Sequence, residues 1–83
     1  MPDASTIALQ ALGWVLQDDG RSQRLLDLTG LTPDNLRSAI GEPSLQVAVL
    51  DFLANYEPDL IGASKALDIA PETILNARRE LSE

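Results

Sequence analysis

The sequence contains no cysteine and no histidine, and these two absences exclude most kinds of site chemistry. Without cysteine there is no disulfide, no thiolate zinc site and no thiol nucleophile. Without histidine the chain lacks the commonest general base and the commonest metal ligand. We therefore expect no enzyme activity, no bound metal and no cofactor.

Aromatic residues are scarce, since the sequence has one Trp, one Tyr and one Phe. Phe52 lies within an apolar stretch and is predicted to be a core residue. Trp14 and Tyr56 lie toward the edges of apolar stretches, where large rings are typical of protein interfaces. Both are candidate partner-binding residues, and burial in the core is the alternative for each.

Positive charge is also scarce, because thirteen acidic residues outnumber six basic ones and give a formal net charge of −7. No segment forms a basic arm, and residues 42–61 are the most acidic part of the chain. Phosphate backbones repel such a surface, so the composition argues against a nucleic-acid partner. No apolar run approaches the roughly 18 residues of a membrane span, and no secretory signal precedes the first expected helix. We expect a cytoplasmic protein that does not enter the membrane.

The sequence does contain regular signals for the starts of helices. The run 31–36 (LTPDNL) returns thirty-eight residues later as the run 69–74 (IAPETI). Proline in the first turn of a helix loses no hydrogen bond, and an acidic residue there meets the positive end of the helix dipole. The pattern predicts one domain over residues 1–83, with a tandem duplication of residues 1–41 and 42–83 as an interpretation.

The apolar spacing predicts a compact all-α bundle of five or six short helices, and no stretch alternates with the period of a strand. The first predicted helix runs from a cap at Asp3 to a turn at residues 18–20, and the second runs from about residue 21 or 22 to 29, with Gly30 as its stop. The third is capped by Thr32 and ends at Gly41. The last three run from 43 to about 56, from 58 onward and from 71 onward. Leu16 belongs to the apolar spacing of the first predicted helix, and the second predicted helix carries Leu25, Leu26 and Leu28.

The fourth predicted helix is expected to be central. Its polar positions Ser44, Asp51 and Asn55 fall on one narrow strip, and apolar residues occupy the rest of its circumference. A helix that is apolar around most of its surface is enclosed by its neighbours. The helix pairs before Pro33 and Pro71 are expected to form two similar helix-turn-helix-like corners.

Residues 63–79 resemble the helix-turn-helix of bacterial transcription regulators. The resemblance implies that Thr73, Asn76 and Arg79 face bases, and that Lys65 and Arg78 lie near phosphates. Glu72 at the start of the second helix opposes this interpretation, because phosphate neutralisation dominates the affinity of such proteins. The alternative is an ordinary helical hairpin that closes the bundle.

Three stretches carry a resemblance over nearly the whole chain. They are residues 8–16 (ALQALGWVL), 25–31 (LLDLTGL) and 50–60, which contains the sequences LDFL and EPDL. Together they resemble a family of short acidic helical bacterial proteins catalogued as a domain of unknown function. The resemblance implies a small helical fold and no functional residues.

These observations favour a non-enzymatic module that binds another protein or a second copy of itself. A nucleic-acid-binding protein that reads through residues 71–81 is the alternative hypothesis.

Overall fold

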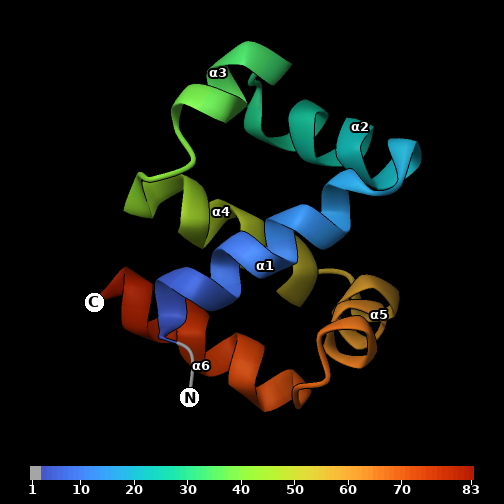
Figure 1. Ribbon diagram of the computed structural model, residues 1–83, viewed down its shortest axis with the longest axis vertical. Coiled ribbons are helices and arrows are strands. Elements are labelled where there is room, and N and C mark those ends of the chain that lie inside the picture. Colours follow the sequence, from blue (N-terminus) through green and yellow to red (C-terminus); the bar gives the residue numbers. More distant parts are fainter. Residues whose placement is uncertain (1–2) are drawn as a thin grey trace.

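The computed structural model describes residues 3–83, and this part of the chain folds into helices joined by short turns without a strand (Figure 1). The helices are α1 (Ala4–Leu16), α2 (Asp19–Thr29), α3 (Pro33–Ser38), α4 (Pro43–Ala54), α5 (Glu57–Leu67) and α6 (Pro71–Ser82). The prediction of an all-α bundle of short helices is therefore confirmed.

The helices begin where the sequence provides caps or prolines. The Asp3 carboxylate accepts a hydrogen bond from the Thr6 amide at 2.8 Å, and this bond holds the pKa of Asp3 below its usual value. Asp18 and Thr32 cap α2 and α3 in the same way, through the amides of Arg21 and Asn35. The other three helices have proline within their first two positions, as the sequence predicted.

The other predicted helix boundaries are less accurate. Asp18 caps α2 instead of closing a three-residue turn, so α2 begins at Asp19, two residues earlier than expected. The predicted stop at Gly41 is wrong, because α3 already ends at Ser38 with Ala39 as its C-cap. Gly30 does end α2 in the left-handed conformation, at φ 73°. The fourth helix ends at Ala54, since Tyr56 serves as the N-cap of α5.

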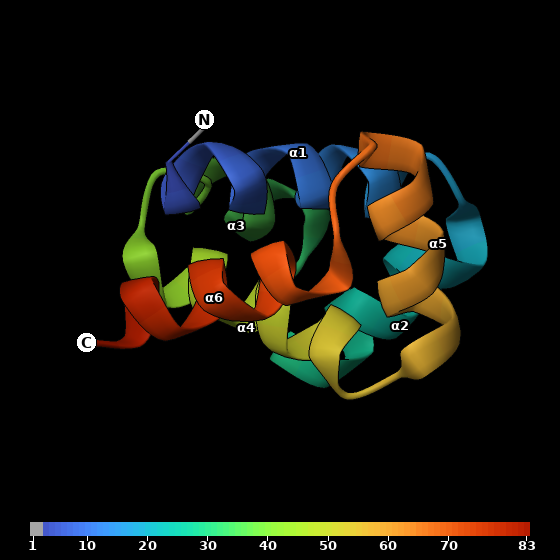
Figure 2. The ribbon, with the colours of Figure 1, turned by 90° about the horizontal axis from the view of Figure 1, so that it is seen from below.

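The core is formed by α1, α4 and α6, which pack against one another. Helices α2 and α5 lie on the same side of this core (Figures 1 and 2), where Arg24 of α2 contacts Asp59 of α5. The central place of α4 is confirmed, and α1 shares it, because both helices contact α2, α5 and α6. The largest fully buried side chains are Leu25, Leu50, Leu53, Ile74, Val15 and Val49. Phe52 is buried as predicted. Leu16 and Leu28, which belong to apolar stretches of the first two predicted helices, are exposed.

The two halves of the chain share their element boundaries. Helices α5 and α6 begin thirty-eight residues after α2 and α3, and α2 and α5 have the same length of eleven residues. Asp68 follows α5 in the left-handed conformation at φ 56°, at the position that corresponds to Gly30. The third helices differ, with six residues in α3 and twelve in α6. The tandem duplication stays a prediction that these shared boundaries support.

Removal of the Leu50 side chain tests the central place of α4. Leu50 is fully buried, so Leu50→Ala leaves a cavity and should lower the free energy of unfolding by about 2 to 5 kcal/mol. Urea denaturation measures the loss. Leu16→Ala is the control, because Leu16 is exposed and its truncation should change stability by less than about 0.5 kcal/mol. A loss below about 1 kcal/mol for Leu50→Ala would place the core elsewhere.

Candidate functional site

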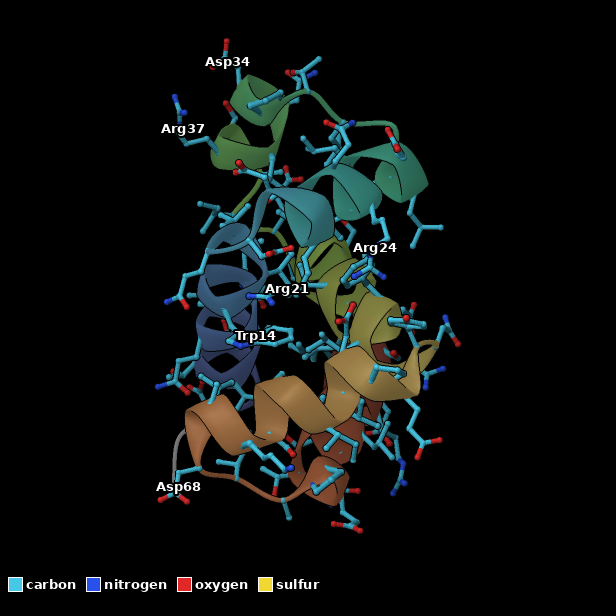
Figure 3. The ribbon with its side chains drawn as sticks, turned by 90° about the vertical axis from the view of Figure 1, so that its right-hand side faces the viewer. Trp14, Arg21, Arg24, Asp34, Arg37 and Asp68 are labelled. Atoms are coloured by element: carbon cyan, nitrogen blue, oxygen red, sulfur yellow. The ribbon has the colours of Figure 1, made fainter. Side chains whose placement is uncertain are left out.

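Trp14 joins three helices. Its ring lies under the Arg21 guanidinium, whose central carbon is 3.7 Å from the ring centroid, and Arg21 Nη2 donates a hydrogen bond to the Trp14 carbonyl at 2.7 Å (Figure 3). On α5, a β-carbon at Gly62 would lie only 2.9 Å from Cζ2 of this ring. The ring is half-buried and packs against the core. Trp14 thus holds α1, α2 and α5 together, and a partner at its Arg21 side would have to displace Arg21.

Tyr56 belongs to a second cluster, centred on Arg24 of α2. Arg24 Nη2 lies 2.7 Å from Oδ2 of the buried Asp59, and the guanidinium lies 4.9 Å from the Tyr56 ring and 5.3 Å from the Phe52 ring. Cations near aromatic faces are stabilised by the ring quadrupole. Tyr56 remains 48% exposed, so its role as a partner-binding residue stays a prediction.

An open hollow lies between the end of α2, the segment before α4, and α4 itself. It measures 470 Å³ and no residue of α1, α5 or α6 lines it. Its lining residues are Leu28, Thr29, Leu31, Ala39, Glu42, Ser44, Leu45, Ala48, Asp51 and Asn55. We call this hollow the α2–α4 groove. Figure 2 shows that α2 and α4 lie on the side of the molecule opposite α1.

The floor of the α2–α4 groove follows one stripe of α4. Ser44, Ala48, Asp51 and Asn55 are spaced as i, i+4, i+7 and i+11, which places them on the same helix face. All four side chains are short, so the stripe forms a depression between bulkier neighbours. The sequence identified three of these residues as a polar strip, but it did not indicate that an exposed leucine borders them.

That leucine is Leu28, which is 67% exposed and is the most exposed of the large hydrophobic residues in the described chain. Leu28 lies three residues after the fully buried Leu25. Because three residues turn a helix by about 300°, the Leu28 side chain points about 60° away from the direction of Leu25. Leucines three residues apart normally share one helix face, so the sequence pattern alone did not indicate that Leu28 is exposed.

The charged residues that line the groove are both acidic. Glu42 is exposed, and the Asp51 side chain is 40% exposed while its Oδ1 contacts Nε of Arg78 on α6. The groove therefore combines an aliphatic wall with an acidic rim. This arrangement can bind an apolar surface that carries positive charge.

The structure places the predicted nucleic-acid residues on two helices, α5 and α6. Thr73 and Asn76 line a 450 Å³ hollow beside the start of α1, while Arg78 and Arg79 line another hollow on the outer side of α6. Arg78 is paired with Asp51, and Lys65 is exposed on α5. Asn76 and Arg79 lie three residues apart on α6 and so share one face, while Lys65 lies on another helix.

The fold and the groove define a small all-α domain with an open, acid-rimmed apolar hollow. The chain belongs to the family DUF3572, described as a protein of unknown function, whose model matches residues 2–83. This match confirms the resemblance to a catalogued domain of unknown function. Neither a curated protein nor a solved structure matches the chain. Among residues 3–83, no helix combines the length and the apolar character needed to cross a membrane.

The close approach of Trp14 to Gly62 can be tested with a matched pair of alanine substitutions. Both Gly13 and Gly62 lie inside helices, where alanine is favoured by up to about 1 kcal/mol. A β-carbon at Gly13 meets nothing within 4 Å, so Gly13→Ala should stabilise the fold by about 0.5 to 1 kcal/mol.

Gly62→Ala should instead destabilise the fold by about 1 kcal/mol, because the added carbon meets the Trp14 ring at 2.9 Å and overpacking exceeds the gain in helix propensity. Arg21 covers the ring and hinders its outward movement. Thermal unfolding followed by circular dichroism measures both variants. Equal stabilisation by the two alanines would show that the indole does not constrain position 62.

Proposed function

We propose that this domain is a non-enzymatic protein-interaction module that binds another protein through the α2–α4 groove. The supporting observation is the 67% exposure of Leu28 at the edge of an open hollow with an aliphatic wall. Full burial of a leucine side chain is favourable by about 1.5 to 3 kcal/mol, so covering Leu28 would contribute directly to binding. Exposed apolar groups rimmed by polar residues are typical of interaction sites.

The chemistry of the groove supports binding over catalysis. A catalytic carboxylate is usually tuned by burial or by a specific neighbour within a cleft. In the α2–α4 groove, Glu42 is open to water and Asp51 contacts Arg78. With neither histidine nor cysteine in the chain, the remaining side chains offer binding contacts but few routes to acid-base or nucleophilic chemistry.

Charge favours a different protein over a second copy as the partner. Two copies each carry a net charge of −7 and would repel one another as they approach. The groove adds to this repulsion, since its two charged residues, Glu42 and Asp51, are acidic. A partner with basic groups would be attracted by the same charges.

Affinity capture with matched surface variants tests this proposal. The wild-type protein and the Leu9→Ser variant, each immobilised, should retain the same proteins from an extract of the source cells. The Leu28→Ser variant should not retain them. Leu9 is the control because it is also exposed, at 40%, and lies on α1 outside the groove. Circular dichroism verifies that both variants are folded. Retention of the same proteins by all three baits would contradict binding through the groove.

Nucleic-acid binding through residues 71–81 is the second candidate function. The three-residue turn between α5 and α6, and the exposed side chains of Lys65, Asn76 and Arg79, support it. Glu72 and Glu80, which are also exposed on α6, oppose it.

A mobility-shift titration with duplex DNA at low salt separates the two candidates. For an interaction module we expect no shift at tens of micromolar protein, where non-specific binding of a true DNA-binding protein should already be visible. A shift that Arg79→Glu abolishes would favour the second candidate, with Arg37→Glu, an exposed position on α3, as the matched control.

A further inference from the structure

We infer that the occupant of the α2–α4 groove is a short amphipathic helix of the partner, with aliphatic side chains on one face and lysine or arginine beside them. This inference rests on the proposed function and specifies the partner's chemistry. It follows from the shape of the floor of the groove, from its aliphatic wall and from the sign of its charges.

The shape of the floor suits a helix. Ser44 and Asn55 are eleven residues apart, which corresponds to about 17 Å or three helical turns. The short side chains of the stripe allow another helix to approach closely along this length. Binding of a peptide by β-strand addition needs an exposed strand edge, and residues 3–83 contain no strand. A helix satisfies its own backbone and needs only side-chain contacts.

The wall of the groove provides the apolar contacts. Leu28, Leu31 and Leu45 border the hollow, and Ala39 and Ala48 leave room between them. Helices that bind in grooves insert apolar residues spaced as i, i+3 or i+4, and i+7. Three turns of a partner helix would provide three such residues, and at least one of them would cover Leu28.

The charges of the groove select the polar flank of the partner. Glu42 and Asp51 are nine residues apart, which separates them by roughly 14 Å along α4. Oδ1 of Asp51 contacts Nε of Arg78, and the Asp51 side chain remains 40% exposed. Basic residues about two to three turns apart on the partner helix would face these two carboxylates. Acidic residues at the same places would be repelled.

Synthetic peptides test the inference directly. The probe is a fluorescein-labelled 14-residue peptide with leucine on one helical face and lysine on the other. One control peptide replaces every lysine with glutamate, and another has the lysine peptide's composition in an order without an apolar face. Fluorescence anisotropy measures their affinities for wild-type protein and for variants in and outside the groove.

We expect the amphipathic lysine peptide to bind at least about ten times more tightly than either control peptide. Leu28→Ser should weaken it about tenfold, as loss of a buried anchor does, and Leu9→Ser less than twofold. Glu42→Lys should weaken it about three- to fivefold, and Glu83→Lys, which changes an exposed charge outside the groove, less than twofold. The peptide should gain helical circular dichroism when bound.

Several results would overturn the inference. Equal binding of the lysine and glutamate peptides would remove the charge argument, and equal effects of Leu28→Ser and Leu9→Ser would place the site outside the groove. A dimer in sedimentation that Leu28→Ser dissociates would make a second copy the occupant. If none of the peptides binds but Leu28→Ser still abolishes protein capture, the proposed function stands and the helical occupant is wrong. If both experiments are negative, both proposals fall.

Discussion

The packing of α4 against α1 and α6 is the contact on which the other features of this fold depend. A chain of 83 residues hides only about two-thirds of its extended surface, so a few fully buried side chains on these helices provide most of the core. Because Leu50, Leu53 and Val49 face that core, only the stripe from Ser44 to Asn55 remains on the open side of α4. The position of the groove is therefore a consequence of how the core is built.

The other wall of the groove depends on polar contacts. Leu25 is the only fully buried residue of α2, so the hydrophobic effect alone orients this helix weakly. Two arginines complete the docking, since Arg21 stacks on Trp14 and Arg24 reaches Asp59. These contacts fix the side of α2 that carries Leu28. Arg21 and Arg24 thus serve the packing of α2 against its neighbours.

Local features of the fold could be predicted from the sequence, and features that depend on distant residues could not. The starts of the helices depend on prolines and on caps such as Asp3 and Thr32, which act within a few residues. The stop predicted at Gly41 failed because the helix ended before that glycine was reached. The groove also escaped prediction, because the position of Leu28 depends on a contact between Arg24 and Asp59 across thirty-five residues.

The environment of Trp14 has a practical consequence for spectroscopy. It is the single tryptophan of the sequence, and it touches Arg21 on α2 and approaches Gly62 on α5. Separation of either helix from α1 would change the polarity around the indole and shift its emission. Intrinsic fluorescence therefore reports the docking of both outer helices without any added label, and comparison with the circular dichroism signal distinguishes local opening from global unfolding.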